Sequence, residues 1–248
     1  MFSPKNHLYL RPSLITILFL IVVMLNLYAQ NMPLVVKSRF FDMQKQNLKD
    51  TISRRTSADY PFIVGYNYIP ITNSESNHPY FKENKWSNGS LVYQGVFYPV
   101  GGLKYDIEID KLIYLMYDKD NTINCVALDE NFIWEFSLLN STFRYYDDLK
   151  NDSGKKLKAC YYEVVYDGKL KFLVRNEKSE TMNDFSGSTN LFLLKDRTMI
   201  GISSMGKLIK QLQDKEKIVK KFVRDSSLVL NKSDYLSASK VLKYYENL

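Results

Sequence analysis

The sequence predicts an α+β protein, a predominantly antiparallel β-sheet (a meander or a small barrel) closed by two C-terminal α-helices. Short runs rich in Val, Ile, Tyr, Phe and Leu recur from Leu91 onward, each bounded by turn residues. Such runs, about 10 residues apart, are typical of antiparallel strands joined by turns rather than of alternating βαβ units. An aromatic share of 14% also suits strands. Residues 203–248 differ, because their apolar side chains recur at helical spacing.

The first 29 residues have the pattern of a signal peptide. A basic stretch without acids precedes an apolar run, Leu14–Leu27, which is shorter than the roughly 18 to 20 residues needed to cross a bilayer. We expect cleavage between Ala29 and Gln30, because small Ala29 suits a signal peptidase; an uncleaved signal anchor is the alternative. The prediction is an exported protein of the periplasm, cell envelope or medium, without a transmembrane segment after cleavage.

Residues 30–85 form an N-terminal segment and loop in this interpretation. A strand is expected over 60–71, ending at Pro70, and a polar loop follows that contains the turn pair Asn88-Gly89. The β domain spans 86–202. Its strand patterns cover 91–100, 101–110, 111–118, 122–129, 132–139, 159–176 and 191–203.

One hairpin and two helices complete the predicted elements. Asp167-Gly168 gives the strongest hairpin turn signal in 159–176. A first helix follows Gly206, with Ser203 or Ser204 as its cap, and a second begins at Ser233. We expect both to pack on the sheet over 203–248. Their expected apolar stripes are Leu208, Leu212, Ile218 or Val219 and Phe222 in the first helix, and Leu236, Val241, Tyr245 and Leu248 in the second.

Two ligand motifs match only in part. Gly201–Lys207 follows the phosphate-loop pattern, but Leu208 stands where a hydroxyl should hold Mg²⁺, so a strand-to-helix turn is the better interpretation. Residues 118–129 resemble a calcium loop, but Ile123 replaces the glycine of its sharp turn. The chain also lacks paired His or Cys-x-x-Cys spacing. We therefore expect no cofactor and no metal site.

Catalytic candidates are few. His78, the only histidine after the signal, lies in a polar stretch without a nucleophile motif. Asp106, Glu108 and Asp110 alternate along a predicted strand, and two such acids could hydrolyse a glycan if the fold brought them together. The simpler interpretation is the outward polar face of an amphipathic strand.

The two cysteines leave two alternatives open. Cys125 and Cys160 both fall in predicted strands. Export to an oxidising compartment would permit a disulfide between them, whereas two buried thiols packing as small apolar groups are the other interpretation.

Net charge is concentrated near the C-terminus. The whole chain carries +7, and residues 203–248 hold ten Lys or Arg against five Asp or Glu, while residues 30–202 are balanced. Basic helices could contact anionic lipid, a polyanionic glycan or an acidic protein; nucleic acid is not expected for an exported chain. The candidate binding residues are Trp86, Trp134, Asp106, Lys217, Lys220 and Lys221.

Several short motifs carry a resemblance: the NGS at 88–90, GVFY, LKYD, the YEVVYDG hairpin and YY near the C-terminus. Over roughly 86–248 the chain resembles a group of exported, uncharacterised bacterial proteins of the Bacteroidetes type. The matching positions are Asn88, Gly89, Gly95, Tyr105, Asp106, Asp167 and Gly168. The resemblance implies export and a β-rich fold, and it implies no activity.

These observations favour an exported, non-enzymatic, β-rich protein of the cell envelope that binds an envelope protein or a glycan. The alternative hypothesis is a carboxylate-based hydrolase acting on glycans. Peripheral membrane contact through the basic helices is a third hypothesis.

Overall fold

The computed structural model describes residues 60–71, 75–117, 122–182 and 184–248, which all belong to one compact unit, Arg55–Leu248. The predicted signal peptide and its cleavage site lie outside the described residues. The strands are β1 (Gly65–Asn67), β2 (Ser87–Tyr93), β3 (Val96–Asp106), β4 (Lys111–Tyr117), β5 (Ile123–Leu128), β6 (Ile133–Leu138), β7 (Ser141–Tyr146), β8 (Lys150–Asn151), β9 (Cys160–Asp167), β10 (Lys171–Thr181), β11 (Asp184–Lys195) and β12 (Thr198–Ile202). The helices are α3 (Met205–Lys210), the 3₁₀ turn η2 (Gln213–Lys215), α4 (Glu216–Asp225) and α5 (Ser237–Glu246).

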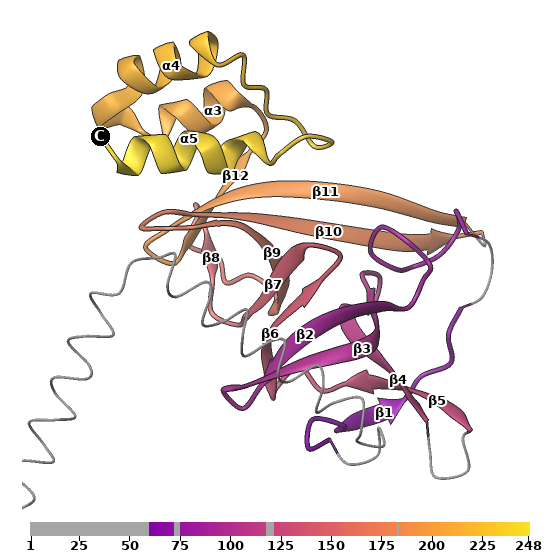
Figure 1. Ribbon diagram of the computed structural model, residues 1–248. Helices are drawn as coiled ribbons and strands as arrows, with labels where there is room; N and C mark the ends of the chain where they lie inside the picture. The colour runs from indigo at the N-terminus through magenta and orange to yellow at the C-terminus, as the bar shows by residue number, and fades with distance from the viewer. Residues whose placement is uncertain (1–59, 72–74, 118–121, 183) are drawn as a thin grey trace, which may run out of the picture. The chain divides into compact units, whose positions relative to one another are not determined.

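The described strands form a single sheet that consists of two meanders (Figure 1). In the first meander β2, β3, β4 and β5 lie in chain order, and in the second β6, β7, β9, β10, β11 and β12 do. All pairings are antiparallel except that of β12 with the short edge strand β8. The predicted antiparallel meander with C-terminal helices is confirmed. The alternative of a small barrel is wrong, because β1 and β8 are the two edges of an open sheet.

The pairing of β2 with β6 joins the two meanders. Gly89 lies opposite Leu138 in this pairing, and an ideal Cβ on Gly89 would lie 2.2 Å from the carbonyl oxygen of Ser137. Only glycine therefore permits this close approach of the two backbones. The sequence interpretation of Asn88-Gly89 as a loop turn is wrong, because both residues are inside strand β2.

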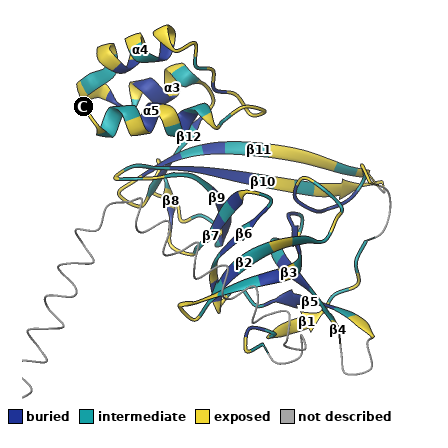
Figure 2. Ribbon diagram, in the orientation of Figure 1, coloured by how far each residue is buried: buried dark blue, intermediate teal, exposed yellow. Residues whose placement is uncertain are grey.

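Aromatic rings fill the core near this junction, whose strands carry many of the buried residues coloured dark blue in Figure 2. Phe136 stacks on Phe143 with ring centroids 4.8 Å apart, and Tyr105 contacts both rings edge-on. Arg175, from the second meander, donates from Nη1 to the Tyr105 hydroxyl (3.1 Å) and to Asp110 Oδ1 (2.6 Å). Its guanidinium therefore ties β10 to the β3–β4 turn.

The first C-terminal helix differs from its prediction. Ser204 caps α3 by accepting a hydrogen bond from the Lys207 amide, as expected. The chain then leaves helical geometry at the buried Leu212 (φ −103°, ψ 45°), so α3, η2 and α4 replace one continuous helix. Within α4, Val219 is buried and Ile218 is exposed, which resolves the alternative that the sequence left open.

The second helix begins later than predicted. Asn231 Oδ1 accepts hydrogen bonds from the amides of Ser233 and Asp234, which makes a turn where a helix cap was expected. Helix α5 follows at Ser237, and its buried residues are Ala238, Val241 and Leu242. Of the predicted stripe, Leu236 and Leu248 are exposed.

Helix α5 docks on the predicted hairpin. Asp167 pairs with Lys171, so β9 and β10 are joined by three residues rather than by an Asp-Gly pair alone. Glu246 accepts hydrogen bonds from the Leu170 amide and from the Tyr166 hydroxyl, both at 2.9 Å. The helices and the sheet also share one apolar cluster, in which Leu208, Val219 and Val241 pack with residues of β10, β11 and β12. Through this cluster the C-terminal helices pack against the sheet.

Candidate functional site

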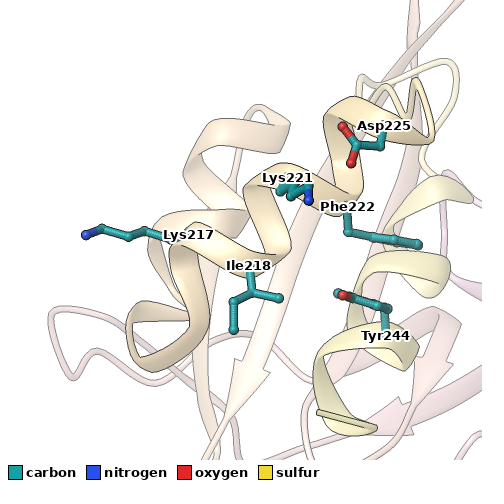
Figure 3. Close-up of a pocket in the computed structure, with 6 residues that line it drawn as sticks. All are labelled: Lys217, Ile218, Lys221, Phe222, Asp225 and Tyr244. Atoms are coloured by element: carbon teal, nitrogen blue, oxygen red, sulfur yellow. The ribbon is translucent and has the colours of Figure 1, made fainter.

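A pocket between α4 and α5 is the strongest candidate binding site. This α4–α5 pocket, about 530 Å³ in volume, is lined by Lys217, Ile218, Lys221, Phe222, Asp225 and Tyr244 (Figure 3). The rings of Phe222 and Tyr244 stack in parallel between the helices, with centroids 3.9 Å apart. In Figure 3, Lys217 extends away from α4 on the other side of Ile218 from these rings.

The spacing of residues along α4 creates this pocket. Val219 and Val223, four residues apart, are buried against the other helices and the sheet. The neighbouring stripes, also at four-residue spacing, are Ile218 with Phe222 and Lys217 with Lys221. Ile218 remains 51% exposed. An apolar strip therefore lies beside two ammonium groups.

The electrostatics of the pocket favour an anion. Among the described residues, the ammonium groups of Lys217 and Lys221 have neither a hydrogen-bond acceptor nor an ion-pair partner. Their Cβ atoms lie about 5–6 Å apart at this helical spacing, and two like charges so placed repel each other. An anionic group between them would relieve that repulsion. Lys220, the third predicted lysine, is exposed on the same helix but does not line the pocket.

Trp86 and Asp106 belong to a different, closed cluster around Tyr80. Lys104 Nζ lies 4.6 Å from the centre of the Trp86 ring and 4.3 Å from that of Tyr80. Asp106 Oδ2 accepts a 2.7 Å hydrogen bond from Tyr68, whose hydroxyl lies 3.2 Å from that of Tyr80. Burial raises the pKa of Asp106 and lowers that of Lys104. Asp106, Lys104 and Tyr80 are all buried, so they offer little surface to a ligand.

The predicted row of carboxylates is wrong. Strand β3 ends at Asp106, so Glu108 and Asp110 belong to the turn that follows, and Asp106 is buried rather than on an outward face. Asp106 accepts hydrogen bonds from the amides of Glu108 and Ile109, Asp110 pairs with Arg175, and Glu108 accepts from the Glu180 amide. The three acids are directed to three different partners.

Trp134 lies in strand β6, outside the cluster around Tyr80. Val92 pairs with Glu135 whereas Tyr93 pairs with Ile133, so Trp134 is the extra residue of a β-bulge. The side chain is 45% exposed, and the guanidinium of Arg144 lies 5.4 Å from its ring centre. Arg144 is held in turn by Glu135 and Asp167. The structure therefore separates Trp134 from Trp86.

Both cysteines are buried free thiols. Cys125 lies in β5 and Cys160 in β9, with β4, β3, β2, β6 and β7 between these strands in the sheet. They belong to different apolar clusters. Of the two alternatives, the structure has the buried thiols and not the disulfide. Within the part of the chain that is described, no three His, Cys, Asp or Glu side chains gather as metal ligands, and the longest helices have ten residues, too few to span a bilayer.

His78 is buried, although it lies in a polar stretch of the sequence. It is 2% exposed, and its Nδ1 accepts a hydrogen bond from the Tyr80 amide (3.1 Å). Lys178 Nζ donates to the carbonyl oxygens of His78 and Tyr80. Burial, and then the charges of Lys178 and Lys104, lower the pKa of the imidazole from its usual 6.5.

We expect this histidine to make the fold acid-sensitive. The unfolded chain binds a proton at His78 near pH 6.5, whereas the folded chain does so only at lower pH, so the free energy of unfolding falls as pH drops from about 7 to about 5. His78→Asn keeps an acceptor for the Tyr80 amide and removes the titration. Urea unfolding over that pH range should give a flatter curve for His78→Asn, because Asp106 and the other titrating groups are common to both chains. Parallel curves would contradict this role of His78.

The binding candidates from the sequence include two of the residues that line this pocket, Lys217 and Lys221, but none of its aromatic residues. The sequence pattern places Phe222 in the apolar stripe of the first helix, and Tyr245 rather than Tyr244 in that of the second. The signal was the adjacent pair Tyr244-Tyr245, because neighbouring residues point about 100° apart on a helix and cannot share one face. In comparisons with protein-family models, curated proteins and solved structures, no match to this chain was found.

Proposed function

We propose that this protein is an exported, non-enzymatic binding module of the cell envelope, and that its α4–α5 pocket holds a charged unit of an acidic glycan. The observation that carries the proposal is the pair of ammonium groups of Lys217 and Lys221, which have no partner among the described residues and lie beside the apolar strip of Ile218 and Phe222. An acidic sugar ring offers the matching combination of an anion and an apolar face.

The shape and charge of this region support a glycan over a membrane surface. A membrane-binding helix lays a broad apolar face on the bilayer, whereas here the lysines border a hollow between two helices. Helix α4 carries four basic and two acidic residues, which adds attraction for a chain of repeated negative charges. Binding should therefore weaken steeply as salt is added.

Replacing both pocket lysines tests the proposal. Lys217→Ala/Lys221→Ala should weaken binding of polygalacturonate about tenfold, or about 1.4 kcal/mol, since each exposed charge pair contributes up to about 1 kcal/mol. Isothermal titration at low salt measures this change, with neutral dextran as the ligand control. The matched variant Lys220→Ala removes the same charge from the same helix outside the pocket and should lose much less.

Three results would count against the proposal. Equal losses in Lys220→Ala and in Lys217→Ala would leave only a diffuse electrostatic attraction. Equal binding of neutral dextran would remove the role of charge. Tighter binding to vesicles containing phosphatidylglycerol than to polygalacturonate would favour peripheral membrane contact instead.

A further inference from the structure

A second pocket lies on the face of the long β10–β11 hairpin. This hairpin pocket has a volume of about 350 Å³, within the range of small-molecule sites. The strand register pairs Asn176 with Thr189 and Lys178 with Gly187, so these four residues share one face. Gly187 has no side chain, and an ideal Cβ built there has no neighbour closer than 3.8 Å. The hollow therefore lies beside Gly187.

The other wall comes from distant parts of the chain. This wall consists of Phe81 and Lys82 from the segment before β2, Ile107 from the turn between β3 and β4, and Tyr235 from the segment before α5. Lys82 has a left-handed backbone (φ 58°), which is uncommon for a residue with a side chain. Its ammonium donates to Ser141 Oγ at 3.1 Å, so the strained backbone accompanies a fixed position of the charge.

A buried carboxylate fixes the polar groups of this pocket. Glu163 is 4% exposed. It accepts hydrogen bonds from Ser141 Oγ (2.7 Å), Tyr235 OH (2.8 Å) and Asn176 Nδ2 (3.1 Å). Asn176 Oδ1 accepts in turn from Thr189 Oγ1 (3.0 Å). Each side chain is thereby held in one orientation before any ligand arrives, which lowers the entropy cost of binding.

The remaining hydrogen-bonding capacity suits hydroxyl groups. The Thr189 hydroxyl already donates to Asn176 Oδ1, which leaves its lone pairs as acceptors, whereas the Tyr235 hydroxyl is engaged by Glu163. Ser188 can donate or accept, and Phe81 and Ile107 provide apolar surface. The charges of Lys82 and Lys178 are balanced by those of Glu163 and Glu177. The pocket therefore favours a neutral ligand with hydroxyls on its rim and an apolar face.

We propose that the hairpin pocket binds an uncharged sugar residue. This site is separate from the α4–α5 pocket, shares no lining residue with it, and does not depend on the function proposed there. A glycan that carries neutral as well as acidic units could use both.

Filling the pocket from Gly187 provides the test. Gly187→Leu should occupy the hollow without a backbone clash, and Gly187→Val is a second variant with a β-branched residue that strands favour. The matched control is Ser186→Leu, which adds the same side chain to the preceding residue of β11; Ser186 is exposed and does not line the pocket. All three are made in the full chain, and thermal unfolding verifies that each folds.

The probes are neutral trisaccharides of glucose, mannose, galactose and N-acetylglucosamine, and trigalacturonate is the acidic comparison. Saturation-transfer NMR measures the binding of each probe at millimolar concentration. We expect at least one neutral probe to bind, a loss of at least about tenfold in both Gly187 variants, and less than about a twofold change in Ser186→Leu. The proposal is overturned if no neutral probe binds, if only trigalacturonate binds, or if the folded Gly187 variants bind as the wild type does. Because Lys217 and Lys221 remain intact, polygalacturonate binding in these variants reports separately on the α4–α5 pocket.

Discussion

Arg175→Met is expected to lower the free energy of unfolding by about 3 to 5 kcal/mol, the usual loss when one partner of a buried ion pair is removed. Arg175 is 9% exposed, and Nη1 alone donates to Asp110 Oδ1, Tyr105 OH and the Tyr161 carbonyl. Methionine fills similar space but donates to none of them. Asp110 would then lie beside the core with fewer hydrogen bonds.

The control for this prediction is Arg224→Met, an exposed arginine whose nearest acid is Asp225 at 3.6 Å. Its loss should stay below about 1 kcal/mol. Urea unfolding of both variants at neutral pH measures the difference. A similar small loss in both would mean that the Arg175–Asp110 pair contributes no more than a surface contact.

Gly89→Ala is expected to cost about 3 kcal/mol, at the upper end of overpacking effects. The new methyl would lie 2.2 Å from the backbone oxygen of Ser137 and 3.0 Å from Leu103 Cδ1. Leu103 can shift its side chain, but Ser137 O belongs to the β2–β6 pairing and can move only if the strands separate. The damage should therefore fall on the junction of the two meanders.

Gly201→Ala is the matched control, since Gly201 is also a strand glycine but has no heavy atom within 4 Å of an ideal Cβ. It should be neutral or stabilise by up to about 1 kcal/mol, because alanine restricts the unfolded chain. Hydrogen exchange adds a local measurement. Gly89→Ala should speed exchange of amides in β2 and β6 more than in β11, and uniform acceleration would contradict a local effect.

The fold class was predictable because it rests on local patterns. Short aromatic and β-branched runs between turns indicate strands, and the turn at Asp167 and the cap at Ser204 use side-chain chemistry within three or four residues. Gly201–Leu212 is confirmed as a strand-to-helix boundary, between β12 and α3.

The misassigned elements depended on distant partners. Asn88-Gly89 looks like a turn until strand β6 is placed against it, and Ser233 looks like a cap until Asn231 takes its amide. Asp106 fits the pattern of an outward polar strand face, but in the structure it is buried and accepts a hydrogen bond from Tyr68, which precedes the predicted polar loop. None of these partners can be read from residue types within one short segment.

In the candidate sites, too, some residues could be placed from local spacing and others only from distant contacts. Lys217 and Lys221 belong to one helix, so their shared face followed from their spacing. Tyr244 reaches that face only because α5 packs beside α4. The hairpin pocket required both the register that sets Gly187 beside Lys178 and the approach of Lys82 and Tyr235 from elsewhere in the chain.

The β2–β6 pairing also has a consequence for the order of folding. Most strand pairs here join neighbours along the chain, which close small loops quickly at low entropy cost. Pairing β2 with β6 requires the closure of a larger loop, which contains the whole of β3, β4 and β5. We therefore expect each meander to begin to form independently, and the contact between Gly89 and Ser137 to form late, when the two meanders pair.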